Sequence, residues 1–519
     1  MEIYMKDGWI RLAQKMAAGV LITALVFGGV PANSSASNLP TVSKRLVLKE
    51  GKTGTVKVSG KYILSTAFQS GDSKIAVVNK KGKVTAKKEG TCNITAAVKY
   101  KKAKSAKKTF TKNFQCVVKV TKGTSSTQEP ENPEVKADPF VQQIVDFSVK
   151  LLQNNASDAL AKGKNVLVSP ESVLCALAMT ANGAQGDTLA EMQSVLCGDM
   201  TLDVFNQKMS DFNQKLTGSD KVKFSIADSI WIRDDAKRIQ MKEDFLALNK
   251  KYYDAESILA AFDNKTVQDI NNWVKDHTNG MIERLIDEIP NEAVSYLINA
   301  IAFEGKWKEQ YTGNDVVGNQ NFTNASGVSE KATMLKGVEH MYIRDNKASG
   351  FVKTYEGDQY AFMAILPNKG VTVQDYLQQL NGKKLLSLYQ NRKNNYYVNT
   401  KMPEFSYDYS TSLVDTLNKM GIRKAFTQEA DFSNMAQVDA ELLYINEVLH
   451  KTHIELDRNG TKAAAVTAVI MEAASAIIPK EEVNVFLTRP FLYAIIDTET
   501  GIPVFMGAVN TLAEELPEN

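Results

Sequence analysis

The 519-residue chain contains only four cysteines and four histidines, and none of them has the spacing of a metal site. It also lacks a Gly-x-Ser-x-Gly nucleophile elbow, a His-Glu-x-x-His helix and a glycine-rich phosphate loop. A catalytic triad scattered along the sequence can be recognised only in three dimensions. These absences predict that the chain is not an enzyme and that it needs no metal and no cofactor.

Long apolar runs are also scarce. Residues 16–30 form the one apolar stretch near the N-terminus, and as a helix it reaches ~22 Å, short of a ~30 Å hydrocarbon core. Three basic residues precede it, and small residues follow it, with cleavage expected after Ala32 or Ala36. We therefore expect residues 1–36 to be a cleaved secretory signal rather than a permanent anchor, and the protein to be secreted or held at the cell surface.

The four cysteines divide into two pairs. Cys92 and Cys116 lie in neighbouring candidate strands, where an oxidising exterior permits a disulfide and two buried free thiols are the alternative. Cys175 and Cys197 lie on predicted helices, and we expect both in the core.

The net charge of +3 conceals a strong asymmetry, because residues 40–120 contain 20 lysines and arginines against 3 acidic residues. A lysine cluster in this basic part is predicted to decorate a hairpin, and it comprises Lys99, Lys101, Lys102, Lys104, Lys107 and Lys108. Two interpretations remain open: attachment to a polyanionic envelope by diffuse electrostatics, or a solvated turn that deters pairing at a sheet edge. We expect no nucleic-acid partner, because the protein is exported and the cluster lacks interleaved aromatic residues.

Residues 46–121 alternate short apolar runs with Gly, Ser, Asn and Lys, which predicts an all-β module. The runs and turns resemble, in their order, the bacterial Ig-like domain of group 2; they lie at residues 69–78, 81–86, 89–96 and 116–120. The resemblance implies a β-sandwich over residues 40–121, of a kind that usually serves as a spacer or adhesive unit. Residues 122–137 are rich in Thr, Ser, Glu and Pro and are expected to form a flexible linker.

From residue 138 onward, helical patterns alternate with strand patterns. One helical face is marked by Phe140, Ile144, Phe147 and Leu151. Ser169 is a natural N-cap before Pro170 at the first position of a second helix. Thr188 and Glu191 have the spacing of a capping box for the next helix.

Residues 460–475, close to the C-terminus, are small and mostly uncharged. With period 2 one face carries Thr461, Ala463, Ala465 and Thr467, and both charges fall on the other face. The segment could therefore enter a sheet as a central strand without burying a charge. A helix is equally compatible, because alanine favours helices and apolar residues also recur at helical spacing.

The blocks around this segment resemble the serpin family, in the family's order. They lie at residues 165–172, 183–188, 270–280, 297–307, 361–367, 402–405, 431–433, 450–465, 488–497 and 503–509. The resemblance implies a serpin domain over residues 138–513, with an α+β fold of three β-sheets, eight to nine helices and an exposed reactive loop.

The resemblance also implies a function, the inhibition of a protease by suicide cleavage. The protease cleaves the loop and forms an acyl-enzyme, and a hinge then inserts into the central sheet as an added strand. The hinge comprises Gly460, Thr461, Lys462, Ala463, Ala464, Ala465, Val466 and Thr467. The family register places the reactive bond at Ala474–Ser475, with cleavage at Met471 or Ser475 as the alternative. Small residues there suit an elastase-like or subtilisin-like serine endopeptidase, and a papain-like cysteine protease is the second possibility.

Further family positions are occupied in this chain. The buried polar cluster beneath the central sheet, called the shutter below, is matched by Ser169, Ser172, Asn299 and His450. Trp307 matches the tryptophan where the loop first enters the sheet. Arg458 and Lys462 depart from the family's acidic residues, and Glu404 stands where the partner of the first is usually a lysine. We therefore predict a charge-reversed ion pair between Arg458 and Glu404, with two unrelated charges as the alternative.

The expected protein is thus an exported, monomeric protease inhibitor that carries a basic Ig-like module. Two other functions remain open. One is a non-inhibitory serpin that acts as a binding module, and the other is a surface adhesin that acts through the Ig-like module.

Overall fold

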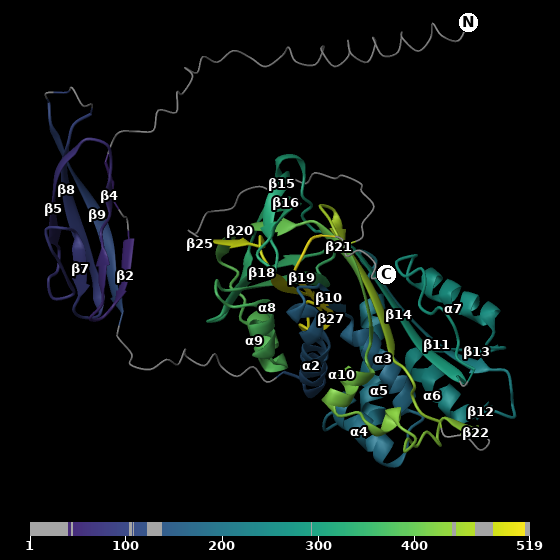
Figure 1. Ribbon diagram of the computed structural model, residues 1–519. Helices are drawn as coiled ribbons and strands as arrows, with labels where there is room; N and C mark the ends of the chain where they lie inside the picture. The colour runs from purple at the N-terminus through teal and green to yellow at the C-terminus, as the bar shows by residue number, and fades with distance from the viewer. Residues whose placement is uncertain are drawn as a thin grey trace, which may run out of the picture. The chain divides into compact units, whose positions relative to one another are not determined.

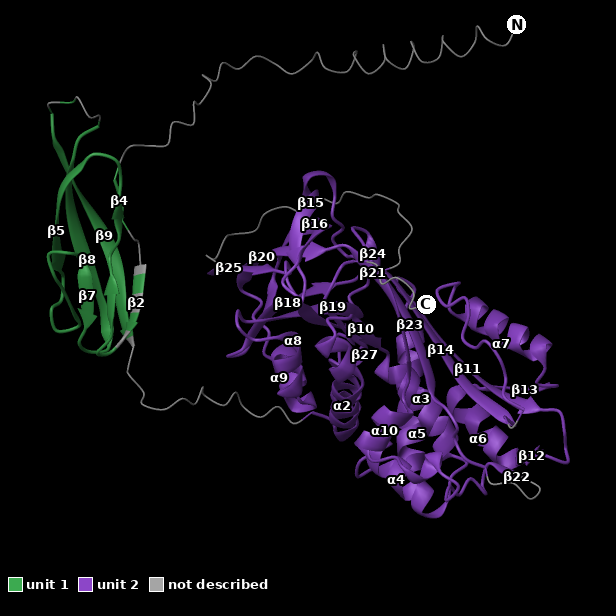
Figure 2. Cartoon of the chain, viewed as in Figure 1, with its two compact units in different colours: residues 1–131 green, residues 132–519 purple. Residues whose placement is uncertain are grey.

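The computed structural model describes residues 40–42, 45–102, 106, 108–121, 137–291, 293–438, 443–461 and 481–513. The predicted signal and nearly all of the predicted linker lie outside these ranges. The chain forms two compact units, residues 1–131 and 132–519 (Figure 2). No helix among the described residues is long and apolar enough to cross a membrane.

The first unit is an all-β sandwich, as the sequence predicts. One sheet has the order β2-β9-β8-β5, the second has the order β3-β7-β6, and β1 pairs with β4. The strands are β1 (Thr41–Val42), β2 (Arg45–Lys49), β3 (Thr53–Thr55), β4 (Val58–Ser59), β5 (Ile63–Ser70), β6 (Ala76–Val78), β7 (Lys83–Ala86), β8 (Gly90–Tyr100) and β9 (Phe110–Thr121). Alternate residues of β8 and β9 point into the core, because side chains alternate across a strand.

Cys92 and Cys116 lie on these two adjacent strands and face the same core. The register pairs Cys92 with Val118 and Cys116 with Ile94, so the two cysteines are offset by two residues. Both are buried free thiols, the second of the two alternatives that the sequence left open.

The β8–β9 hairpin carries the predicted lysine cluster, of which Lys104 and Lys107 lie outside the described residues. The expectation that this cluster lacks interleaved aromatic residues is wrong. Pairing of the two strands places Phe110 opposite Tyr100, and the ammonium groups of Lys102 and Lys108 lie 5.0 and 5.6 Å from the centre of the Phe110 ring. Lys108 is two residues from Phe110 in sequence, whereas Lys102 reaches the ring only because the hairpin folds back on itself.

The second unit combines nine α-helices in its described part with three large sheets (Figure 1). The helices are α2 (Pro139–Ala161), α3 (Pro170–Ala181), α4 (Gly186–Leu196), α5 (Leu202–Thr217), α6 (Glu243–Tyr253), α7 (Asn264–His277), α8 (Val373–Gln378), α9 (Gly382–Gln390) and α10 (Val414–Met420), with 3-10 turns at Gly313–Asp315 and Lys424–Phe426. This content agrees with the α+β architecture of three sheets and eight to nine helices that the sequence implied.

Two of the three large sheets have six and four strands, and the six-stranded one contains fully buried strands. The six-stranded sheet has the order β10 (Val166–Val168), β27 (Pro503–Val509), β26 (Phe491–Asp497), β19 (Tyr360–Pro367), β18 (Ala348–Thr354) and β17 (Met341–Arg344). The four-stranded sheet has the order β15 (Val316–Thr323), β16 (Ser329–Glu339), β20 (Tyr396–Pro403) and β25 (Glu481–Phe486). Every residue of β19, β26 and β27 is buried, which explains their nearly continuous apolar sequences.

The third large sheet has the order β13 (Glu256–Ala260), β11 (Lys223–Arg233), β14 (Ser295–Lys306), β24 (Gly460–Thr461), β23 (Leu449–Leu456) and β21 (Phe405–Ser412). Helix α7 packs on one face of β11 and β14 through Ile270 and Val274, and α3 packs on the opposite face of β14. A short pair, β12 (Ile239–Met241) with β22 (Ala436–Val438), stands apart from it.

The helix starts follow the sequence at two places and depart from it at a third. The apolar face predicted from Phe140 is buried in α2, and Ser169 caps α3 with Pro170 at its first position. The capping box predicted at Thr188 is wrong, because the N-cap of α4 is Gln185, three residues earlier. The Thr188 hydroxyl instead accepts a hydrogen bond from the Asp431 backbone N–H at 2.9 Å, so a tertiary contact uses the group that would have capped the helix.

Candidate functional site

The third sheet is open in its middle. Strand β24 is only two residues long, and it pairs with β14 through Thr461–Gly305 and with β23 through Thr461–Leu456. On their outer sides, β14 is paired with β11 along ten residues and β23 with β21 along eight. Among the described residues no other strand lies between β14 and β23. Their facing backbone groups below Thr461 are therefore available for one more strand.

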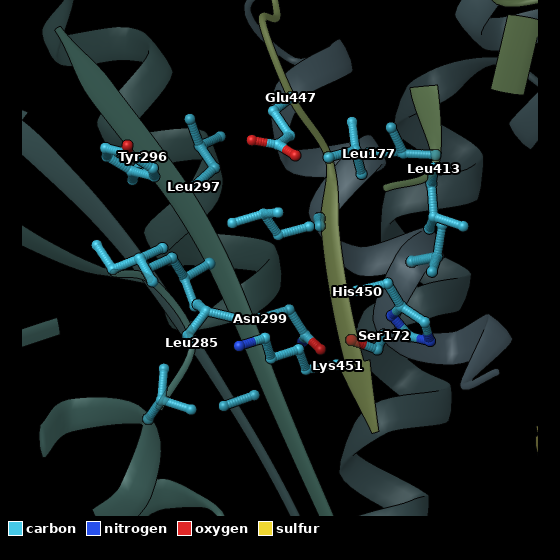
Figure 3. A pocket seen from close by; sticks show the side chains of 18 of the residues that line it. Ser172, Leu177, Leu285, Tyr296, Leu297, Asn299, Leu413, Glu447, His450 and Lys451 are labelled. Carbon is cyan, nitrogen blue, oxygen red and sulfur yellow. The ribbon is translucent and has the colours of Figure 1, made fainter. Parts of the chain in front are cut away.

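A cavity of about 1170 Å³ lies at this opening. Its lining includes Ser172 from α3, Asn299 from β14 and His450 from β23, together with apolar side chains such as Leu177. Figure 3 shows Asn299 on one bordering strand, across from His450 and Ser172. The cavity is thus bordered by residues that the sequence assigned to the shutter.

Three of the four shutter residues form one hydrogen-bonded group. The Ser169 backbone N–H donates to His450 Nε2 at 3.1 Å, and the Ser169 hydroxyl donates to the carbonyl oxygen of Val504 at 3.0 Å. The Ser172 backbone N–H donates to Ser169 Oγ at 3.4 Å. Burial lowers the pKa of His450 to about 4, so the imidazole is neutral at pH 7 and can accept at Nε2.

The fourth shutter residue has a different partner. Asn299 lines the same cavity, but its side-chain Nδ2 donates to Asp228 Oδ1 on β11 at 3.0 Å. Its Oδ1 is buried and has no hydrogen-bond partner among the described residues. Asn299 is thus tied to the neighbouring strand, on the side of β14 away from the opening.

Two buried acids that the sequence did not suggest lie near Asn299, one on β11 and one on α3. Asp228 is 4 % exposed and Glu171 is fully buried. Burial raises the pKa of Asp228 to about 8 and that of Glu171 to about 7. Glu171 Oε1 accepts from the Cys175 thiol at 3.0 Å. The available signal for each was that it is the single acidic residue of its strand or helix.

The hinge begins at the head of the opening. Thr461 is 4 % exposed, and its hydroxyl lies 2.7 Å from the Tyr355 hydroxyl, beneath the sheet. A side-chain Cβ at Gly460 would overlap the carbonyl oxygen of Gly305, so β14 and β24 can approach each other only with glycine at that position. Thr461 therefore points inward, as its parity in the sequence predicts.

Trp307 stands directly after β14 at the same place. It is 1 % exposed, its ring is stacked on Tyr355 at 4.5 Å, and its Nε1–H donates to the Asp457 carbonyl oxygen at 2.9 Å. A buried ion pair that the sequence did not suggest lies against it. Lys353 Nζ is 3.0 Å from Glu339 Oε1, and the same ammonium lies 5.5 Å from the centre of the Trp307 ring.

The structure brings Arg458 and Glu404 together on neighbouring segments. Arg458 Nε and the Arg458 backbone N–H each lie 3.2 Å from Glu404 Oε1. The side chains are 49 % and 23 % exposed, so the pair is partly solvated. The register of β21 with β23 makes this contact, because it pairs Phe405 with Leu456.

The remaining hinge positions and the reactive bond lie outside the described residues. They are Lys462, Ala463, Ala464, Ala465, Val466, Thr467, Ala474 and Ser475. Within the described ranges, no group of three or more His, Cys, Asp or Glu side chains could hold a metal ion.

Comparisons with known proteins assign both units to families. Residues 142–512 match the model of the serpin (serine protease inhibitor) family, and residues 36–110 match that of the bacterial Ig-like domain (group 2). Alaserpin of Manduca sexta is 31% identical over 360 residues, which cover 67% of this chain and 88% of that protein. Human neuroserpin is 27% identical and covers 70% of this chain and 90% of its own length.

Solved structures agree with this assignment. The native state of tengpin, a thermophilic serpin, is 40% identical with a TM-score of 0.67, and the alignment covers 74% of this chain and 96% of that one. Its latent state is 39% identical with a TM-score of 0.64, covering 72% and 98%. The chain therefore belongs to the serpin family of protease inhibitors, and it carries a bacterial Ig-like domain of group 2 before its serpin domain.

Proposed function

We propose that this chain traps a serine endopeptidase that cleaves it at Ala474–Ser475, and that residues 462–474 then insert between β14 and β23. The observation that carries the proposal is the two-residue strand β24, which is already paired on both sides at the head of an open sheet. Insertion extends a ladder that has begun, so it needs no new nucleation between the two bordering strands.

Insertion would release free energy because it completes backbone hydrogen bonds along two strand edges and fills the cavity beneath them. A run of about 14 residues at ~3.3 Å each carries an attached protease by ~45 Å. A translation of that size would separate the captured protease from the top of the sheet, where the loop begins. The native fold would act as the store of this free energy.

The parity of the hinge supports insertion. Thr461 points inward, so in a continuous strand Ala463, Ala465 and Thr467 would also face the cavity, and Lys462 would face solvent. All three inward residues are small, and small side chains can pass between occupied neighbours. This pattern favours an inhibitor over a non-inhibitory serpin.

The proposed target has a small, apolar specificity pocket, because Ala473 and Ala474 precede the reactive bond. We propose an elastase-like or subtilisin-like serine endopeptidase, with a papain-like cysteine protease as the second class. We also propose that the protein is secreted or held at the cell surface, on the basis of the apolar stretch at residues 16–30.

The test is to mix the full chain with a panel of these proteases and to look for complexes that survive SDS. Mass spectrometry of the released C-terminal fragment identifies the cleaved bond. A stable complex with a fragment that begins at Ser475 is the expected result. Cleavage without a complex and without a gain in heat stability would overturn the proposal and favour a non-inhibitory serpin.

Two matched variants separate insertion from mere cleavage. Ala465→Arg places a charge on the inward face of the hinge and should convert the inhibitor into a substrate, because an unpaired buried charge opposes insertion. Ala464→Arg adds the same side chain on the outward face and should keep complex formation. Equal behaviour of the two variants would contradict insertion in this register.

A further inference from the structure

The hairpin of the Ig-like unit brings lysine and aromatic side chains into direct contact. Lys102 and Lys108 lie over the ring of Phe110, and Lys112 Nζ lies 5.3 Å from the centre of the Phe114 ring. Phe110 also contacts the ring of Tyr100 at 5.9 Å. Lys102, Lys108, Lys112, Phe110 and Phe114 are called the hairpin surface here. It gathers at the end of β8 and β9, which run side by side in Figure 1.

The lysines of the hairpin surface are held in place yet remain open to solvent. Phe110 and Phe114 are half-buried, whereas the three lysines are exposed. An ammonium is attracted to the negative face of an aromatic ring, and this attraction restricts a side chain that would otherwise be mobile. Such a lysine loses less conformational freedom when it binds an anion, so the surface is partly organised for a ligand.

The positive charge of this hairpin is not balanced by acidic residues nearby in the sequence. Residues 90–128 contain no acidic residue, and neither does the adjacent strand β5. Lysines only a few residues apart lie within one Debye length of about 8–10 Å and repel one another. A bound polyanion would remove this repulsion, whereas the isolated unit must tolerate it.

Protection of a sheet edge accounts for only part of the cluster. Lys99 lies on β8, where it is paired with Ser65 of β5 on one side and Thr111 of β9 on the other, so it guards no edge. Lys112 lies on the half of β9 that β2 does not reach, because β2 pairs with β9 only from Val117 onward. The edge explanation therefore fits Lys112 and does not fit Lys99.

We propose that the hairpin surface binds an acidic polysaccharide, a flexible glycan chain that carries carboxylate or phosphodiester groups. Residues 40–121 contain a single arginine, so the bidentate forks that proteins use on bases and phosphates are nearly missing. The ring faces are covered by ammonium groups, whereas proteins that bind single-stranded nucleic acid leave such faces open for base stacking. Lysine point charges instead suit a polymer with regularly spaced anions. This inference is independent of the protease-trapping proposal.

The experiment measures binding of the full chain to polygalacturonate, with neutral dextran and oligothymidylate as comparison polymers. The variant K102S/K108S/K112S should lose at least about 10-fold in affinity for polygalacturonate, because three ammonium contacts are removed. Phe110→Leu keeps an apolar side chain but no aromatic face, and it should lose affinity by a smaller factor. The control K80S/K81S/K83S removes the same charge from the turn before β7 and from the first residue of β7, and it should change affinity by less than about 3-fold.

Four results would overturn the inference. Equal losses in the two triple variants would mean that net charge alone attracts the polymer. Tighter binding of oligothymidylate than of polygalacturonate, lost in the same variant, would mean a nucleic-acid partner. Binding to dextran as strong as to polygalacturonate, or no binding to any of the three polymers, would remove the acidic ligand altogether. All variants should still trap protease, so a failure here is distinguishable from a failure of the inhibitor proposal.

Discussion

The buried carboxyl group of Asp228 provides the sharpest test of the electrostatics beneath the open sheet. Replacement by asparagine keeps an oxygen that can accept the hydrogen bond from Asn299 Nδ2 and removes only the ability to ionise. The charged or titratable groups that face this carboxyl are Glu171 and Cys175 on α3, and Tyr253 and Asp254 at the end of α6. None of these groups is a cation, so none can neutralise an ionised Asp228.

The magnitude follows from the pKa of Asp228, which burial raises from an ordinary 3.8 to about 8. Below pH 3.8 the folded and unfolded states both hold the proton, and the carboxyl group carries no penalty. As the pH rises toward 8, the unfolded state ionises while the folded state retains the proton, so the free energy of unfolding falls. At 1.36 kcal/mol per pKa unit, the accumulated penalty above pH 8 is on the order of 5 kcal/mol.

The assay is the midpoint of thermal unfolding at pH 5 and pH 9, for the parent chain and for Asp228→Asn. The variant should unfold at a higher temperature than the parent, and the gain should be several degrees larger at pH 9 than at pH 5. Asp220→Asn is the control, because it removes the same charge from a side chain that is 86% exposed. An equal gain at both pH values, or no gain at pH 9, would refute the reasoning.

Three further predictions concern the same unit. Replacing Arg458 or Glu404 by alanine should lower the free energy of unfolding by only about 0.2–1 kcal/mol, because the pair is partly solvated. The double swap Arg458→Glu with Glu404→Lys should restore the melting temperature. Additive losses in the double swap would show that the two charges do not interact. Stability should fall as the pH drops from 6.5 toward 4, because His450 stays neutral in the folded state while the unfolded state takes up a proton. The variant His450→Gln should remove this part of the dependence of stability on pH. An unchanged pH profile in the variant would contradict the prediction. Lys353→Met should lower the free energy of unfolding by about 3–5 kcal/mol, because it leaves Glu339 buried without its cation. The double variant Lys353→Met with Glu339→Gln should lose less stability. If thermal unfolding shows that the single variant is at least as stable as the double variant, the pair does not contribute as proposed.

Local sequence was sufficient where the physics is local. The helix N-cap at Ser169 and the buried face of α2 depend on residues within one or two turns, and both were predictable from spacing. Strand alternation likewise predicted an all-β first unit and the inward direction of Thr461. The order of the sequence blocks was enough to indicate both families.

The local pattern of residues 460–475 could not decide between strand and helix. The structure decides it for Gly460 and Thr461, because β14 and β23 offer them partners on both sides. The start of α4 was decided in the same way, since Asp431, more than 240 positions away, uses the hydroxyl of Thr188. Backbone groups form hydrogen bonds with the partners that tertiary packing places beside them. A helix or strand propensity of a few tenths of a kcal/mol per residue is too small to prevent these bonds.

The sequence by itself determined the two-unit organisation, the family of each unit, the alternation of the hinge and the candidate partner of Arg458. Only the tertiary structure showed the buried acids Asp228 and Glu171 near Asn299, the pair of Lys353 with Glu339, and Lys102 over the ring of Phe110. The physical reason is common to all of these contacts. Each joins residues from different elements, so it depends on the register and packing of whole strands and helices, which no short stretch of sequence specifies.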